Sequence, residues 1–278
     1  MSDLTIIIPT YEMPDKVRRA VASVRRQGLG ADIVVVDDCS STTLDIEPGA
    51  DLAIIRHDQN RGAGAARNTG ITHVGTPWVG FLDADDELLE GTLATRFDFA
   101  RGVTGDRPTI IGCGWIEDDE AIVRLPHRGD TAEAFASGCW YCPGSTLLAR
   151  REVFAERPLH EPLRRLEDFD WGIRFGADGG RLVVQNVAGV RIVRTVATGS
   201  AQVEAAAEMI SMRAAALFAD APDRLCRVRA YLDYEKAAFA WAEGRRAQGL
   251  RYLAASWLRV PRLRKHLSPG WTWQRRTV

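Results

Sequence analysis

Acidic residues are concentrated at the end of an apolar segment in the first third of the chain. Residues 79–82 are mostly apolar and lead directly into Asp83-Ala84-Asp85-Asp86. An apolar run of this length predicts a buried strand, and open α/β sheets bind ligands at the carboxyl ends of such strands. Carboxylates this close repel one another unless a cation lies between them. The pattern therefore suggests a divalent metal with oxygen ligands, although a solvated acidic turn before a helix would have the same sequence.

Other polar segments occupy equivalent places in the predicted sheet. They are Pro9-Thr10-Tyr11-Glu12 after a strand at 4–8, Asp37-Asp38 after a strand at 32–36, and the glycine turn at 60–68, which carries Arg67. The carboxyl ends of parallel strands meet at one edge, so together these segments suit a nucleotide diphosphate. Tyr11 can flank a base, Asp38 can accept hydrogen bonds from base or ribose, and Arg67 supplies positive charge. Asp85 can hold a metal that neutralises the diphosphate.

The elements that position these groups alternate in type along the first hundred residues. Strands are expected at 4–8, where Pro9 should end the strand, and at 32–36, 52–56 and 78–82. Helices are expected from Pro14 to Gly28 and within 60–74. This order predicts a mainly parallel α/β sheet. We expect residues 1–100 to form the half of the chain that binds the nucleotide diphosphate.

The chain changes character after residue 100. Strands are expected at 109–116, 145–149, 182–184 and 190–193, with helices around 130–137 and 167–178. We interpret residues 101–200 as a mixed continuation of the sheet that would house a second substrate. Residues 201–278 are expected to form a helical C-terminal extension, whose first two faces are marked by Ala205, Met209, Met212 and Ala216, and by Leu225, Val228, Leu232 and Phe239.

Composition excludes several classes of protein. The net charge is −1, which argues against nucleic-acid binding by bulk electrostatics. The five cysteines form an odd set without disulfide spacing, and neither a signal peptide nor an apolar run of 18 residues is evident, so we expect a cytoplasmic protein. Residues 245–278 carry nine Arg or Lys residues, interleaved tryptophans and no acid. This segment suits peripheral contact with the inner face of a membrane or a phosphate-bearing acceptor, or else packs as an ordinary surface helix.

With these motifs in order, the chain resembles a family 2 glycosyltransferase of the GT-A fold. The matching segments are 5–12, 34–40, 60–62 with 66–70, 81–86, and a later group made of 150–154, 167–170 and Arg174. The resemblance covers about residues 4–200, and the C-terminal extension lies outside it. It implies that residues 1–100 form a nucleotide-sugar-binding half and that residues 101–200 form an acceptor-binding and catalytic-base half. Two departures stand out. Glu12 occupies a place where Asn is more usual, and residues 194–200 resemble the family's basic loop without its frequent His.

The resemblance implies an inverting enzyme that uses a nucleotide-sugar donor, with UDP or dTDP preferred over GDP, and a hydroxyl acceptor. By position it implies Asp168 as general base beside Glu167, Asp85 as the ligand of Mn²⁺ or Mg²⁺, and Arg194 as a diphosphate contact. The implied nucleotide contacts are Pro9, Thr10, Tyr11, Glu12, Asp38, Arg67, Asp83 and Ala84. From the residues alone, Glu167 and Asp168 also fit an acid pair favoured by a helix N-terminus.

Two other interpretations stay open at this point. A sugar-nucleotide pyrophosphorylase-like enzyme would need a Gly-rich loop and a Lys close after the first strand, where this chain has only Lys16 on a predicted helix. A non-catalytic pseudo-enzyme that binds nucleotide would share the same motifs. Aromatic residues could also form an acceptor platform, although such residues commonly belong to the core; they are Trp115, Trp140, Tyr141 and Trp171.

Overall fold

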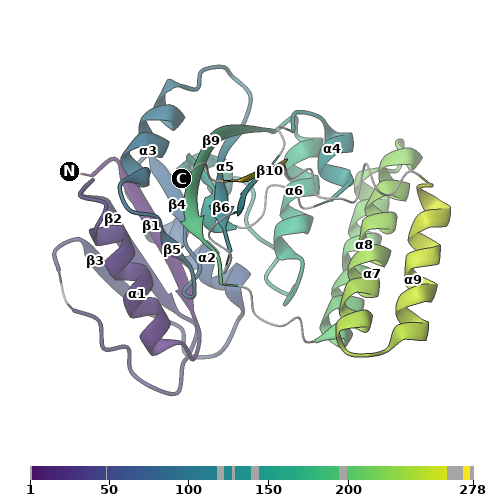
Figure 1. The fold of residues 1–278 in the computed structure, drawn as a ribbon, viewed down its shortest axis with the longest axis horizontal. Helices are drawn as coiled ribbons and strands as arrows, with labels where there is room; N and C mark the ends of the chain where they lie inside the picture. Colours follow the sequence, from purple (N-terminus) through teal and green to yellow (C-terminus); the bar gives the residue numbers. More distant parts are fainter. Residues whose placement is uncertain are drawn as a thin grey trace.

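The computed structural model describes residues 2–47, 49–117, 122–126, 129–138, 144–193, 199–261 and 272–275. Its described strands join in one mixed sheet in the order β10-β7-β6-β8-β4-β1-β2-β3, and β9 pairs with β5 and β6 (Figure 1). The strands are β1 Leu4–Thr10, β2 Asp32–Asp37, β3 Leu52–Arg56, β4 Trp78–Phe81, β5 Glu87–Leu88, β6 Thr109–Ile116, β7 Ile122–Leu125, β8 Leu148–Arg150, β9 Arg181–Arg191 and β10 Thr272–Arg275.

Helices cover this sheet and extend beyond it at the C-terminal side. They are α1 Pro14–Arg25, α2 Ala63–His73, α3 Thr92–Gly102, α4 Ala132–Ala136, α5 Arg151–Ala155, α6 Glu167–Ala177, α7 Ser200–Leu217, α8 Pro222–Ala242 and α9 Arg246–Arg259, with a 3₁₀ turn η1 at Gly144–Thr146. The expected α/β class, its mixed continuation and the helical C-terminal region are confirmed. Among the described helices, none combines the length and apolar character needed to cross a bilayer.

The N-terminal strands are parallel, as their pattern predicts. β1 pairs in parallel with β2 and β4, and β2 pairs in parallel with β3. The expectation that Pro9 ends the first strand was wrong, because Pro9 pairs with Val36 inside β1. β4 has already ended at Phe81, opposite Ile7, so the missing N–H of Pro9 faces no strand on that side. The parallel strands therefore end together near residues 10, 37 and 82.

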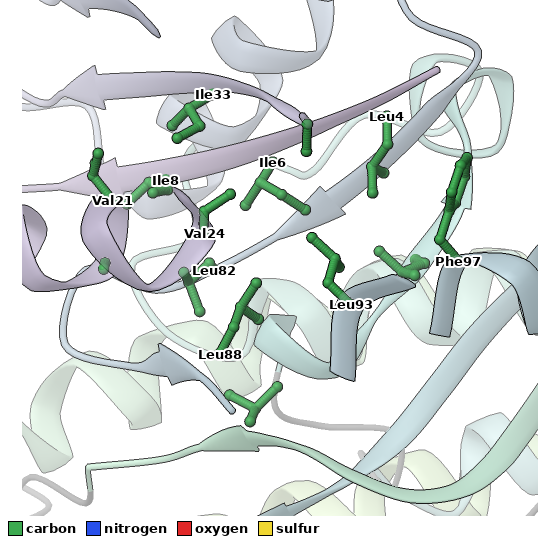
Figure 2. Packing of buried hydrophobic residues seen from close by; sticks show 14 of the residues in the cluster. Leu4, Ile6, Ile8, Val21, Val24, Ile33, Leu82, Leu88, Leu93 and Phe97 are labelled. Carbon is green, nitrogen blue, oxygen red and sulfur yellow. The ribbon is translucent and has the colours of Figure 1, made fainter. Parts of the chain in front are cut away.

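Alternate residues of β1 support two separate cores, one on each face of the sheet. Leu4, Ile6 and Ile8 pack with α1 and α3 on one face (Figure 2). Ile7 packs on the other face with α2 residues and with Phe81. There α2 lies so close to β1 that a Cβ added at Gly70 would be 2.4 Å from Ile7 Cγ2. This close approach fixes the start of α2, and hence Arg67, relative to the strand ends.

The second half differs from the sequence expectation at two strands. Residues 181–191 form the single strand β9, with register shifts near Cys113 and Gly114 of β6, instead of two short strands. The strand expected at 145–149 begins only at Leu148, because residues 144–146 form η1. The helices expected around 130–137 and 167–178 are present as α4 and α6.

The three C-terminal helices form a bundle at one end of the molecule (Figure 1). The predicted buried face of α7 was wrong: Met212 is 76% exposed, whereas Val203, Ile210 and Ala214 are buried. The alanines of α7 are distributed around the whole helix, so the apolar pattern in its sequence does not distinguish one face from another. On α8 the predicted positions Val228 and Leu232 are buried. Residues of α7 and α8 pack against Phe169 and Ile173 of α6, so the bundle lies against the helix that carries Asp168.

Candidate active site

The acidic turn after β4 is tightly anchored. Its backbone closes with Asp86 N–H donating to Asp83 O at 3.0 Å. The buried Ser145 hydroxyl donates to Asp86 Oδ2 at 2.6 Å and accepts from Asp83 N–H at 2.9 Å, while Val193 N–H donates to Asp86 Oδ1 at 3.2 Å. Burial first, and repulsion from Asp83 second, raise the pKa of Asp86 to about 8. Asp86 therefore fastens the turn to η1 and to the end of β9, and it holds Asp83 in place.

Arg67 joins two motifs that are 84 residues apart in sequence, the acidic turn at Asp83 and the start of α6 at Glu167. Its Nη2 donates to Asp83 Oδ1 at 2.6 Å, and its Nη1 donates to Glu167 Oε1 at 3.1 Å. The guanidinium also lies over the Phe81 ring, 5.8 Å from its centroid. Burial disfavours the charge, but Asp83 and Glu167 outweigh that effect and raise the pKa of Arg67. Arg67 thus stays cationic and links the acidic turn to the start of α6.

The start of α6 presents its two acids differently. Leu166 precedes the helix with φ of 59°, a left-handed conformation that an L-residue adopts at an energetic penalty. The Glu167 side chain is 16% exposed and pairs with Arg67. Its partial burial, followed by repulsion from Asp168, raises the pKa of Glu167. Asp168 accepts from Phe169 N–H at 2.8 Å through Oδ1. The first turn of the helix therefore holds one acid in an ion pair and places the other beside it.

A cavity of about 430 Å³ brings four of the predicted residues together. Arg67 and Asp83 from the first half of the chain line it together with Glu167 and Asp168 from the second half. Its lining also includes the apolar side chains Phe81, Leu147, Phe154, Leu159, Leu166 and Trp171. An apolar pocket with a few convergent charged groups is the usual form of a small-molecule site. The cavity is therefore the candidate active site.

Asp38 lies at the neighbouring strand end and is not among the residues that line this cavity. Its Oδ1 contacts His57 Nδ1 at 2.7 Å and accepts from Arg61 N–H at 2.8 Å, and its Oδ2 accepts from Gly62 N–H at 2.6 Å. Gly62 has φ of 96°, which favours glycine. These contacts show Asp38 holding the glycine turn that leads into Arg67. A direct contact between Asp38 and nucleotide stays a prediction.

The segment from Pro9 to Glu12, which covers the end of β1 and the residues after it, is only partly buried. Pro9 and Thr10 are buried, and the Thr10 hydroxyl has no hydrogen-bond partner within the described part of the chain. Tyr11 is 46% exposed, as a ring that stacks on a base would have to be. The carboxylate of Glu12 accepts from Ser41 N–H at 2.7 Å and from Ser41 Oγ at 2.9 Å. Glu12 therefore binds the loop after β2, a contact that its residue type did not predict.

Asp85, the residue predicted to bind the metal, lies beside Lys16. Asp85 Oδ2 is 3.8 Å from Lys16 Nζ, and the Asp85 side chain is 19% exposed. Burial, followed by repulsion from Asp83, raises the pKa of Asp85. Within the described ranges, no group of three or more His, Cys, Asp or Glu side chains is placed to cage a metal. Mg²⁺ commonly needs only one or two carboxylates together with substrate phosphates, so the excess negative charge at this turn fits a divalent ion bound with a diphosphate.

Several predicted residues fall elsewhere. Arg194, Trp140 and Tyr141 lie outside the described residues. Trp115 is 2% exposed within the core beside β1, so it does not form an acceptor platform. The Ala84 side chain is buried in the same core, which leaves only its backbone for a ligand.

Sequence reasoning missed a second set of cavity residues. Val203 of α7 and Tyr231, Glu235 and Phe239 of α8 line the same cavity as the motif residues. The last three are spaced by four, which places them along one side of a helix. That spacing was readable in the sequence, but nothing in it indicates that the stripe faces Asp168.

Comparison with known proteins identifies a family whose model matches the first half of the chain. The Glycosyl transferase family 2 model matches residues 5–157. Succinoglycan biosynthesis protein ExoO of Rhizobium meliloti (strain 1021) is 36% identical over 210 residues, which are 67% of this chain and 59% of that protein. Amylovoran biosynthesis glycosyltransferase AmsB of Erwinia amylovora is 24% identical over 204 residues, 66% of this chain and 68% of that protein. The chain spans less than two thirds of ExoO and 29% of the related ExoU.

Solved structures share the fold at low sequence identity. S. aureus TarS in complex with UDP superimposes with a TM-score of 0.56 at 15% identity, covering 92% of this chain and 90% of that one. Mannosyltransferase PcManGT from Pyrobaculum calidifontis, in complex with GDP-Man and Mn²⁺, gives a TM-score of 0.60 at 18% identity, covering 91% and 74%. The expected GT-A fold is confirmed. Glu167, Asp168 and the helices α7–α9 lie beyond the residues that the family model matches.

Proposed function

Because this chain belongs to glycosyl transferase family 2, we propose that it transfers a sugar from a nucleotide-diphosphate sugar to an acceptor hydroxyl with inversion. The acceptor is a glycan, a glycolipid or a natural product. The observation that carries this proposal is the convergence of Arg67, Asp83, Glu167 and Asp168 on one cavity. A pyrophosphorylase-like enzyme would have no need of a general base at the start of α6.

Asp168 is the proposed general base. The acceptor oxygen attacks the anomeric carbon, the bond from that carbon to the diphosphate oxygen breaks, and the hydroxyl proton passes to the Asp168 carboxylate. A positioned base of this kind contributes about 10²–10⁴-fold to rate. Glu167 is already committed to Arg67 through the 3.1 Å hydrogen bond, which supports Asp168 rather than Glu167 as the group that receives the proton.

The donor nucleotide is proposed to bind along the strand ends beside the cavity. Tyr11 is exposed enough to stack on the base. Thr10, whose buried hydroxyl has no hydrogen-bond partner in the described part of the chain, is proposed as a further nucleotide contact. The remaining proposed nucleotide contacts are Pro9, Glu12, Asp38, Arg67, Asp83 and the backbone of Ala84, with Arg194 for the diphosphate. TarS has been crystallised with UDP and PcManGT with GDP-Man. We favour UDP or dTDP over GDP for this chain on the resemblance of its motifs.

Asp85 is the residue proposed to hold Mn²⁺ or Mg²⁺. When bound, the ion would offset the negative charge that develops on the leaving diphosphate. Burial is the first cause of the raised pKa values of Asp85 and Asp86, and repulsion from Asp83 is the second. The repulsion among these carboxylates supports a cation at this turn. Lys16, 3.8 Å from Asp85, supplies positive charge at the same turn from α1.

A thermal-shift panel tests the donor proposal. UDP-, dTDP- and GDP-sugars, each with Mn²⁺, are compared for their effect on the melting temperature, because a ligand that binds the native state raises it by mass action. A true donor should stabilise the protein and then release free nucleotide in a coupled assay. Stabilisation without release supports the pseudo-enzyme interpretation, and pyrophosphate formation from a sugar phosphate and a nucleoside triphosphate supports the pyrophosphorylase-like one. Absence of stabilisation by every sugar nucleotide contradicts the proposal.

We further propose that the protein is cytoplasmic and that α9 rests on an anionic membrane surface. Leu250, Trp257 and Leu258 of α9 are 55%, 54% and 73% exposed, and the exposed Arg246 and Arg251 lie on the same helix. Exposed apolar and tryptophan side chains next to arginine are typical of helices that bind in the interfacial region of a bilayer. The helix packs on α8 at the end of the molecule, away from the strands of the N-terminal half (Figure 1).

Vesicle co-sedimentation tests the membrane contact. Wild-type protein should sediment with vesicles that contain phosphatidylglycerol and much less with pure phosphatidylcholine. Leu258→Glu should reduce sedimentation several-fold, whereas Met212→Glu, an equally polar change at an exposed residue of α7, should leave it unchanged. Equal sedimentation of all three proteins contradicts the assignment of this surface.

A further inference from the structure

One wall of the cavity is built by a helix that lies outside the matched family region. Tyr231, Glu235 and Phe239 lie four residues apart on α8, and all three line the cavity together with Asp168. The family model ends at residue 157. This wall therefore belongs to the C-terminal extension, yet it faces the residue proposed to act as base.

Glu235 is an acid in a largely apolar wall. Burial raises the pKa of Glu235, a hydrogen bond from the Tyr231 hydroxyl opposes that rise, and the negative charge of Asp168 adds to it. The influence of Asp168 means that the two carboxylates, which line the same cavity, are electrostatic neighbours. A buried carboxylate is unfavourable unless donors satisfy it, and its two oxygens can accept about four hydrogen bonds. Glu235 therefore has capacity for donors in addition to Tyr231.

The rest of the lining indicates what kind of molecule supplies such donors. The cavity carries four carboxylates, on Asp83, Glu167, Asp168 and Glu235, against two guanidinium groups, on Arg67 and Arg165. This balance disfavours a phosphate or another anion. Trp171, Tyr231 and Phe239 add aromatic surface. A sugar ring has hydroxyl donors around its edge and an apolar C–H face, so it matches a carboxylate set among aromatic rings.

We propose that Glu235, supported by Tyr231, binds a hydroxyl group of an uncharged acceptor sugar and orients that sugar toward Asp168. Glu235 is in this view a positioning residue, and the C-terminal extension completes the acceptor site. The inference rests on the proposed glycosyl transfer. The inference differs from the proposed function in that it assigns binding of the acceptor, and not of the donor, to α8.

The test separates transfer to a sugar from transfer to water. Octyl β-D-glucopyranoside and octyl β-D-galactopyranoside serve as soluble probe acceptors, with the donor identified by the thermal-shift panel. For Glu235→Gln we expect the KM for the probe to rise about 10- to 100-fold, as for loss of a hydrogen bond to a charged group, while kcat falls less. The KM for donor should stay within about twofold of wild type, and donor hydrolysis without acceptor should fall less than transfer to the probe. Tyr231→Phe should show the same pattern with a smaller rise.

Controls make each outcome decisive. Glu208→Gln changes an exposed acid on the neighbouring α7 and should match wild type in every assay. Glu235→Gln should retain the wild-type melting temperature or exceed it at neutral pH, because the amide removes a charge that burial disfavours. An unchanged KM for the probe, or equal losses of hydrolysis and transfer, overturns the inference. Donor hydrolysis by wild type without transfer to either probe contradicts the acceptor class, whereas no donor binding at all contradicts the proposed function instead.

Discussion

Replacing Arg67 by methionine removes the cation that joins the two halves of the candidate site. The Arg67 side chain is 11% exposed, and its partners Asp83 and Glu167 are 33% and 16% exposed. Loss of one member of a buried, hydrogen-bonded ion pair commonly destabilises a protein by about 3–5 kcal/mol, because the remaining charge is left buried without a partner. The partial exposure of Asp83 places the expected loss near the lower end of that range.

The loss should depend on pH in a defined direction. Burial already raises the pKa of Glu167 above its ordinary value of 4.5 in the presence of Arg67, whose charge acts in the opposite direction. Without Arg67 the pKa of Glu167 in the folded protein rises further, so the folded variant binds protons more readily than its unfolded chain. Unfolding free energy of the variant therefore falls as pH rises above 4.5. The deficit relative to wild type should be largest near pH 8 and smaller near pH 5.

Urea unfolding followed by tryptophan fluorescence at pH 8 and pH 5 measures this difference. Arg67→Lys is the matched control, because lysine keeps the positive charge but lacks the planar guanidinium that donates to Asp83 and Glu167 through two separate nitrogens. It should recover part of the stability at both pH values. A deficit below about 1 kcal/mol for Arg67→Met, or one that is equal at both pH values, would refute the reasoning about buried charge.

Three further changes test other parts of the account. Gly70→Ala should destabilise the protein by about 1–3 kcal/mol in urea unfolding, because the new Cβ would be 2.4 Å from Ile7 Cγ2; Gly75→Ala, where a Cβ meets nothing within 4 Å, should have little effect, and equal losses would contradict the close packing of α2 on β1. Ser145→Ala should cost about 1–3 kcal/mol and raise the KM for donor, because Asp86 and the Asp83 amide lose their shared partner; an unchanged KM would mean that the turn needs no such anchor. Asp85→Ala should abolish activation of nucleotide release by Mn²⁺, as EDTA should for wild type. Undiminished turnover of wild type in EDTA would contradict the proposed metal ion.

How far the sequence predicts the structure depends on the range of the interactions involved. β3 and β6 match their expected bounds, because apolar runs bounded by turn residues are local signals. Pro9 was misread because its tolerance inside β1 depends on where β4 ends, which is a tertiary fact. The buried face of α7 was misread because its alanines make all faces similar, and the choice is made by packing against α6 and α8.

In the candidate site, too, some contacts follow from local sequence patterns and others depend on tertiary packing. Arg67 and Asp83 were predicted to lie near one another because consecutive parallel strands end at one edge, and the two residues are hydrogen-bonded. The contact between Arg67 and Glu167 joins positions separated by one hundred residues, and no local pattern encodes it. Glu235 was missed for the same reason, since its helix lies beyond the family motifs and reaches the cavity only through the packing of the C-terminal bundle on α6.

Nucleotide release and donor binding, measured side by side for wild type and Asp168→Asn, show whether Asp168 acts as the general base in this cavity. We expect the variant to bind the nucleotide-sugar as wild type does but to lose transfer by about 10²–10⁴-fold, because the amide cannot take the acceptor proton. Wild-type turnover by Asp168→Asn would contradict the claim that the cavity shared by Arg67, Asp83 and Asp168 is where the sugar is transferred.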